Sequence, residues 1–237
     1  RNHDYLTEIG LAAFDSRDMQ HFAANPGPHA EKMLKQIYFY HFRILPNTHM
    51  VNRTWCVGVP ENNRFGVTLF TTHEETKGMM KQSFNWPVDE ADPLKGNCPV
   101  IFLGHAGHGD LQRLRDALGF DASGTVVRII DTQVMARGLG LHHQQIGLGS
   151  LMSCYGCPYR DSHTAGNDAA YTIIDAILMA VYGRNVPKFS KTPLQVVDEV
   201  EEASIRRSVC DWGTRPSARA AMLIRICEKT VVRGPDA

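Results

Sequence analysis

Two stretches of the sequence place a histidine five residues before an aspartate: "HTAGND" joins His163 to Asp168, and "HAGHGD" joins His105 to Asp110. The residues after each aspartate are apolar with helical period, so both carboxylates are expected in the first turn of a helix. Carboxylate oxygens are the ligands that hard divalent cations prefer, and an imidazole can take a proton from water near neutral pH. These residue types could together carry out a metal-assisted hydrolysis.

The same spacing has a structural explanation that needs no chemistry. An H-x-x-x-x-D pattern is expected by chance in a chain that contains 11 histidines. Asp168 or Asn167 could cap the helix, because a carboxylate in the first turn interacts favourably with the helix dipole. His163 would then be an ordinary loop residue. The spacing alone does not separate the two alternatives.

Strands and helices are expected along most of the chain. Alternating or β-branched runs predict strands, and apolar residues with helical period predict helices. Thr72 and Glu75 together predict a capping box at a helix start. Strands are predicted over 5–16, 36–45, the ends of 53–70, 98–105 and 125–132, and helices after the Pro/Gly loop at 25–28, over 72–84, 110–118, 147–156 and 168–182, and from about 192 onward.

The two aspartates are expected to meet at one edge of a sheet. The strand over 98–105 comes shortly before Asp110, and each aspartate begins a helix. In α/β sheets the residues that follow strand ends gather along the carboxyl edge, where sites are built. Asp110 and Asp168 could there share a divalent metal that keeps water positions open for a phosphate substrate. His163 would stand beside that metal.

The composition is that of an ordinary globular protein, with 43% hydrophobic and 21% charged residues in a chain of 237. One large domain is the simplest expectation. The formal net charge is zero, which excludes a generally basic nucleic-acid coat protein and requires any polyanion site to be local. The six cysteines are irregularly spaced, which favours a reducing compartment over a disulfide framework. No apolar run is long enough to span a membrane.

Taken in order, the motifs resemble the DEDDh class of 3′-to-5′ exonucleases. They are "TEIGLAAFD", "FLGHAGHGDLQRL", "IIDT" and "HTAGNDAAYT", spread over roughly residues 5–182. The resemblance implies an α/β fold of ribonuclease H-like type, a mixed sheet flanked by helices. It implies that Asp110 and Asp168 are metal ligands for two Mg²⁺ or Mn²⁺ ions and that His163 is the general base. Single-stranded nucleic acid, RNA favoured, would be shortened from its 3′ end to nucleoside monophosphates.

The residues of the segments "LTEIG" and "HTAGNDAAYT" are most similar to those of a fungal branch of this class. That branch includes an exonuclease that is the partner of an Argonaute protein in RNA silencing. The resemblance implies an Argonaute-type partner, no membrane, and a cytoplasmic or nuclear location. Residues 1–185 are expected to form the exonuclease domain and residues 186–237 a helical extension with a basic tail. The tail arginines could hold a nucleic-acid backbone or a protein partner.

The chain departs from the class at the first motif. The resemblance places a D-x-E motif about ten residues before the "TEIG" strand, upstream of Arg1, and Asp4, Asp15 and Asp18 do not fit it. Because the chain begins with arginine and not methionine, we expect that first strand to lie upstream. The competing hypothesis is a catalytically inactive ribonuclease H-like module that binds nucleic acid or an Argonaute-type partner. A D-x-E motif upstream favours the enzyme.

Several other features have both functional and structural interpretations; the structural ones are favoured except at Asp131, where the two are equally supported. Cys154 and Cys157 form a C-x-x-C pair that could bind zinc, but a second pair is lacking and ordinary thiols are expected. Asp131 could support the site or cap the next helix. His108 could touch substrate, but we expect it to be exposed. The aromatic run over 38–42 could stack bases, but in a strand it is expected in the core.

Overall fold

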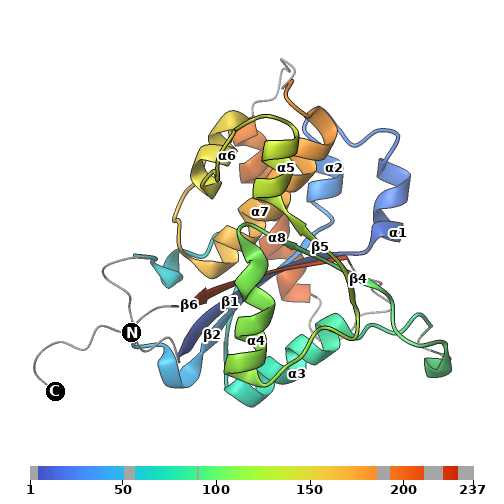
Figure 1. Ribbon diagram of the computed structural model, residues 1–237, viewed down its shortest axis with the longest axis vertical. Helices are drawn as coiled ribbons and strands as arrows, with labels where there is room; N and C mark the ends of the chain where they lie inside the picture. The colour runs from blue at the N-terminus through green and yellow to red at the C-terminus, as the bar shows by residue number, and fades with distance from the viewer. Residues whose placement is uncertain (1–4, 51–56, 90, 186–192, 211–220, 229–237) are drawn as a thin grey trace, which may run out of the picture.

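The computed structural model describes residues 5–50, 57–89, 91–185, 193–210 and 221–228. Within these residues one mixed sheet of six strands has helices on both of its faces (Figure 1). The strands lie in the order β3-β2-β1-β6-β4-β5. They are β1 (Leu6–Phe14), β2 (Tyr38–Ile44), β3 (Val67–Thr71), β4 (Val100–Gly104), β5 (Val126–Asp131) and β6 (Ala221–Glu228).

Helices connect these strands. The α-helices are α1 (Ser16–Met19), α2 (Glu31–Leu34), α3 (His73–Phe84), α4 (Asp110–Leu118), α5 (Thr132–Gly138), α6 (Leu148–Cys154), α7 (Ala165–Tyr182) and α8 (Pro193–Cys210). Short 3-10 helices are η1 (Gln20–Phe22), η2 (Leu45–Asn47), η3 (Pro60–Asn62), η4 (Pro93–Lys95) and η5 (Gly107–Gly109). Among the described helices, none is both long and apolar enough to cross a lipid bilayer.

Most predicted elements are confirmed, and the start of α3 shows why. The Thr72 hydroxyl accepts a hydrogen bond from the Glu75 N–H at 3.2 Å, and the Glu75 carboxylate accepts one from the Thr72 N–H at 2.8 Å. This is the predicted capping box, and it fixes the helix at its first turn. The short helix α1 was not predicted.

The position of β6 is the main difference from the sequence-based expectation. Residues beyond 210 were expected as a basic tail, but β6 lies between β1 and β4 (Figure 1), antiparallel to β1 and parallel to β4. Its apolar run fits a central strand, and the arginine within that run hid the pattern. The rest of the predicted tail, 211–220 and 229–237, lies outside the described residues.

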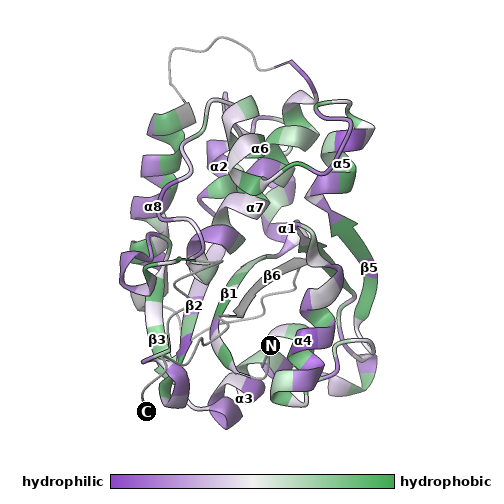
Figure 2. Ribbon diagram, turned by 60° about the vertical axis from the view of Figure 1, so that its left-hand side comes forward, coloured by the Kyte–Doolittle hydropathy of each residue, from purple (hydrophilic) through white to green (hydrophobic). Residues whose placement is uncertain are grey.

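Two apolar clusters fill the space between the sheet and its helices. Figure 2 shows α3 and α4 on one side and α2, α6, α7 and α8 on the other, and each group encloses one cluster. Alternation along β1 directs Ile9 and Leu11 to the α3–α4 side and Ala12 to the α7 side. Phe39 and Phe42 lie in opposite clusters and are 2% and 0% exposed, which confirms the core interpretation of the aromatic run.

The backbone of α7 rests directly on β1. A Cβ atom placed on Gly10 would lie 1.8 Å from the Ala165 carbonyl oxygen and 2.7 Å from the Gly166 nitrogen. Both neighbours are backbone atoms, which cannot rotate away as a side chain can. Glycine at position 10 therefore sets how closely the first turn of α7 approaches the sheet.

Replacing Gly10 with alanine should lower the free energy of unfolding by about 2–3 kcal/mol, because the methyl group forces the helix off the strand. Gly78→Ala is the matched control. Gly78 lies on the exposed side of α3, and a Cβ atom placed on it would have no neighbouring atom within 4 Å, so alanine there should add about 0.5–1 kcal/mol. Urea unfolding of the two variants checks both signs, and equal effects would contradict the close approach.

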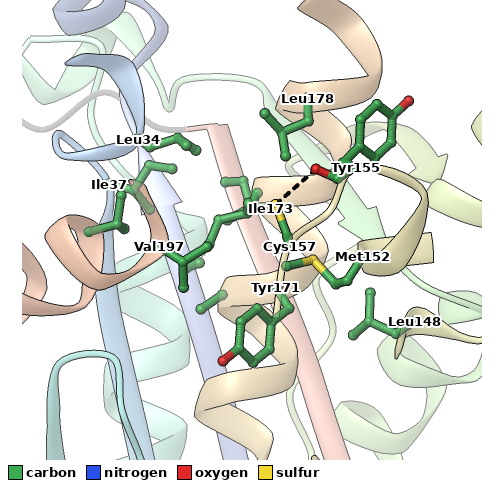
Figure 3. Close-up of a cluster of buried hydrophobic side chains, with 14 of the residues drawn as sticks. Leu34, Ile37, Leu148, Met152, Tyr155, Cys157, Tyr171, Ile173, Leu178 and Val197 are labelled. Atoms are coloured by element: carbon green, nitrogen blue, oxygen red, sulfur yellow. Dashed lines mark hydrogen bonds between the residues drawn. The ribbon is translucent and has the colours of Figure 1, made fainter. Parts of the chain in front are cut away.

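The cluster on the α7 side also encloses a carboxyl group. Asp175 is fully buried, and neither of its side-chain oxygens has a hydrogen-bond partner among the described residues. Burial raises its pKa well above the usual value. Two polar neighbours are Cys157, whose thiol pKa burial raises to about 12, and Tyr155, whose hydroxyl donates to the Gly183 carbonyl. Figure 3 shows Cys157 and Tyr155 among the apolar side chains of this cluster.

Because its folded-state pKa is raised, Asp175 stabilises the fold only while it is protonated. That contribution is complete below the unfolded pKa of about 3.9 and is lost as pH rises toward the folded value. We expect wild-type stability to fall relative to Asp175→Asn by up to about 1.4 kcal/mol per pH unit across that window. Urea unfolding from pH 4 to pH 8 measures the difference, and parallel stability curves would show that this prediction is wrong.

Candidate functional site

The first turn of α7 carries one half of the predicted site. The helix begins at Ala165 with Thr164 as its N-cap residue, and the Thr164 side chain makes no capping hydrogen bond. Asp168 lies in the first turn, as expected, but neither Asp168 nor Asn167 occupies the cap position. The helix starts three residues before the predicted position because Ala165 and Gly166, which carry no periodic apolar signal, pack directly against the sheet.

The structure brings His163 and Asp168 together. The Asp168 Oδ1 atom accepts a hydrogen bond from the backbone N–H of His163 at 3.3 Å and one from the Tyr159 hydroxyl at 2.6 Å. Asp168 is 1% exposed, whereas His163 is half-buried. The carboxylate therefore closes the turn that presents the histidine. Tyr159 was not singled out in the sequence, since it lies nine residues away in a segment without regular pattern.

The turn before α7 has an unusual backbone. Asp161 has a φ of 50° and His163 a φ of 62°, which places two non-glycine residues in the left-handed region. Residues with side chains adopt this region at a cost, and such strain persists only where surrounding contacts impose it. Left-handed non-glycine residues are concentrated at functional sites. The histidine is thus held in a conformation that it would not adopt alone.

Asp110 forms the other half of the predicted site. It is the first residue of α4, directly after η5, and is 4% exposed. Its Oδ1 atom accepts a hydrogen bond from the Arg113 guanidinium, one turn later, at 3.0 Å. The predicted position at the carboxyl edge is confirmed, because α4 follows the end of β4 after a short connection.

The polar residues around the ends of β4 and β5 are structural. Asp131 accepts hydrogen bonds from the Gln133 N–H at 2.8 Å and the Gly107 N–H at 3.1 Å, so it caps α5 and holds η5. The cap interpretation is confirmed. The buried His105 ring is hydrogen-bonded to the Thr132 hydroxyl at 2.8 Å. His108 is exposed, as expected.

The described residues do not include a group of three or more His, Cys, Asp or Glu side chains placed to hold a metal ion. Asp110, Asp168 and His163 thus supply oxygen and nitrogen donors of the expected kind, but they do not form such a group. β6 lies between β1, on which α7 rests, and β4, after which Asp110 follows. The role of the two aspartates as metal ligands stays a prediction.

Sequence reasoning missed Glu8, which lies beneath the start of α7. Glu8 is 0% exposed in the middle of β1, and its Oε2 atom accepts a hydrogen bond from the Ala165 N–H at 3.3 Å. The same atom is 3.0 Å from Nε2 of the buried His41, whose Nδ1 atom is 2.9 Å from the Thr68 hydroxyl. The signal was a charged residue inside an otherwise apolar strand, which requires a buried partner.

The C-x-x-C pair has the properties of ordinary thiols. Cys154 is exposed at the end of α6, and its thiol faces the Ser150 carbonyl at 3.4 Å. Cys157 is buried, and its thiol contacts the Tyr155 carbonyl at 3.8 Å (Figure 3). A thiol whose pKa burial raises to about 12 is a poor source of the thiolate that zinc requires.

A pocket of about 230 Å³ opens beside the ends of β4 and β5. Six of its eight lining residues are polar, and the other two are Ala106 and Val134. The polar ones are Arg137, His108, Gln133, Gln144, Gln145 and the carboxylate Asp131. Hydrogen-bond donors of this kind suit a polar or phosphorylated ligand.

Comparison with known proteins supports the sequence motifs. Residues 1–179 match the family described as DEDDh_C, DNA polymerase III subunit epsilon-like, C-terminal domain. Neither curated proteins nor solved structures give a match.

The hydrogen bond between Tyr159 and Asp168 should be measurable by itself. A hydrogen bond to a carboxylate contributes about 1.5–3 kcal/mol, so Tyr159→Phe should destabilise the protein by about that amount. In a double-mutant cycle with Asp168→Asn, the two losses should couple by more than about 1 kcal/mol. Urea unfolding of the four proteins tests this, with Tyr182→Phe as a control, and additive losses would count against the contact.

Proposed function

The chain belongs to the DEDDh exonuclease-like family, which matches three quarters of its length, and we propose that it is a metal-dependent 3′-to-5′ exonuclease acting on single-stranded nucleic acid. Family membership makes the protein a nuclease-type hydrolase in general, with the mixed α/β sheet of that fold. One observation supports the finer proposal most directly. The turn before α7 joins the backbone N–H of His163 to the Asp168 carboxylate by a hydrogen bond, where the start of the helix rests on β1.

In this proposal each site residue has one task. His163, presented on the strained turn, accepts the proton of the attacking water. Asp168 fixes that turn through the His163 N–H and, with Asp110, offers carboxylate oxygens to divalent ions. When bound, such ions lower the pKa of water and stabilise the departing 3′ oxygen. Arg113, one turn later on α4, donates a hydrogen bond to the Asp110 carboxylate and orients it.

The polar pocket beside β4 and β5 supports a nucleic-acid substrate. It lies next to the η5 turn that leads into Asp110, so a strand entering the site would pass its arginine and glutamines. Arg137 is suited to a phosphate and the glutamine amides to base or ribose hydroxyls. The product of each cycle is a nucleoside monophosphate.

Single-stranded RNA is the proposed substrate and an Argonaute-type protein the proposed partner, in the cytoplasm or the nucleus. This proposal is supported by the sequences of the segments "LTEIG" and "HTAGNDAAYT", which resemble those of the branch of the class that acts in RNA silencing. Matched RNA and DNA oligonucleotides decide between the two nucleic acids, since only RNA offers a 2′-hydroxyl. Co-purification with an Argonaute protein tests the partner.

The proposed activity is tested with single-stranded oligonucleotides labelled at the 5′ or the 3′ end, with Mg²⁺, with Mn²⁺ and with chelator. We expect metal-dependent release of mononucleotides from the 3′ end. His163→Ala, Asp110→Asn and Asp168→Asn should each reduce the rate by at least about a hundredfold, because each removes a proposed reacting group.

His21→Ala is the matched control, because His21 is exposed in η1 and belongs neither to the proposed site nor to the wall of the pocket. It should cleave at the wild-type rate. Unchanged activity in His163→Ala would refute the proposed base. If the oligonucleotide is bound but never shortened, with or without metal, the protein is a nucleic-acid-binding module and the proposed activity is wrong.

A further inference from the structure

The strained turn that carries His163 is held by one neighbouring stretch, residues 58–66, which we call the clamp segment. The Thr164 hydroxyl donates to the Val59 carbonyl at 3.0 Å. A Cβ atom on Gly58 would lie 2.0 Å from the His163 carbonyl oxygen, so the two backbones are in contact. The clamp segment thus touches the turn at the His163 carbonyl and at the side chain of the next residue, Thr164.

Asn167 ties the turn to the clamp segment from inside the protein. Its side chain is 0% exposed, and its amide nitrogen donates to the Asn62 carbonyl at 3.0 Å and the Asp161 carbonyl at 3.1 Å. Its amide oxygen accepts the Arg64 N–H at 2.7 Å. One buried amide therefore joins the clamp segment to the first of the two left-handed residues.

The side chain of Arg64 extends this connection to α8. Its Nε and Nη2 atoms each donate to the Glu201 carboxylate at 2.8 Å, in a two-pronged pair, and its Nη1 atom is 3.2 Å from the Asp161 carboxylate. Hydrogen bonding to Glu201 raises the pKa of Arg64 above its usual value. The planar guanidinium thus bridges a carboxylate on α8 and the left-handed Asp161.

The base of α8 is itself well fixed. Val196, Val197 and Val200 are 0–2% exposed and lie in the apolar cluster around α7. Ser204 lies on α8 one turn after Glu201, and its hydroxyl accepts a hydrogen bond from the Gly66 N–H at 2.9 Å. This is a second attachment of the clamp segment to α8. The clamp segment therefore rests on a helix that is packed into the core.

We propose that Arg64 is a positioning residue, which transmits the support of α8 to the turn and keeps His163 in its left-handed, reactive conformation. The proposal rests on the function assigned above to His163. It makes α8, which lies outside the matched residues 1–179, part of the working site. Without the Arg64 side chain, the Asp161 carboxylate keeps the Asn62 amide, which donates to it at 2.9 Å, but loses its link to α8. The turn is then less restrained and can relax toward ordinary φ values. That relaxation moves the imidazole away from the attacking water.

The test uses Glu201→Gln and Arg64→Lys in the full chain. The first weakens the pair by removing its negative charge, and the second keeps the positive charge but cannot bridge two carboxylates. We expect kcat to fall about tenfold to a hundredfold, with KM changed by less than about twofold and a displaced kcat–pH profile. The double variant should lose no more than the worse single one, because the two residues act as one connection.

Arg206→Gln is the matched control, since it breaks an ion pair on the same helix, with Glu202, that points into solvent. It should leave kcat unchanged. Each rate is measured well below the thermal midpoint of that variant, so that loss of folding does not enter. If Glu201→Gln and Arg64→Lys lower the thermal midpoint but keep the wild-type kcat and pH profile, the Arg64–Glu201 pair has only a structural role. The proposal that Arg64 positions His163 is then wrong.

A second measurement separates this inference from the proposed function. The amide resonance of His163 should shift in Glu201→Gln and not in Arg206→Gln, whether or not the protein cleaves nucleic acid. A shift without any wild-type cleavage would reject the exonuclease proposal and keep the connection from α8 to the turn. If the wild-type protein cleaves nucleic acid but the His163 resonance does not shift in Glu201→Gln, the exonuclease proposal stands and the connection from α8 to the turn is rejected.

Discussion

The close contact between β1 and the start of α7 is the constraint on which the rest of the structure depends. At Gly10 the strand backbone meets the helix backbone without a side chain between them. Two residues before Gly10 in the same strand, Glu8 accepts the Ala165 N–H, one of the amides that a helix start leaves without an intrahelical partner. The strand therefore fixes both the distance and the direction of α7. Because Asp168 lies in the first turn of α7, that contact also determines the position of its carboxylate.

The positions of the site residues are determined by parts of the chain that are far apart. The strained turn is supported by the clamp segment, which is about 100 residues earlier, and by α8, which is about 40 residues later. Glu8 in turn is hydrogen-bonded to His41 on the neighbouring strand. A site of this kind is fixed only when the whole sheet and its covering helices are assembled.

Local patterns predicted the elements well, because periodicity and capping are local properties. The capping box at Thr72 and the first-turn positions of Asp110 and Asp168 follow from a few neighbouring residues. The Arg64–Glu201 pair could not be predicted, since its partners are 137 residues apart and many other charged residues were available. β6 was missed because its place in the sheet depends on its pairing with β1 and β4, which are far away in the sequence. Glu8 was visible as an anomaly, but its partners required the register between β1 and β2.

The place of β6 has a consequence for how the chain is made. Strands β1 and β4 leave the ribosome long before residues 221–228, yet each has one of its sides paired with β6. Until the last strand emerges, the centre of the sheet is an open slot with two unpaired apolar edges. Such contacts between distant parts of a chain form slowly and expose surfaces that aggregate. During most of synthesis these two edges therefore lack the partner that they have in the folded protein.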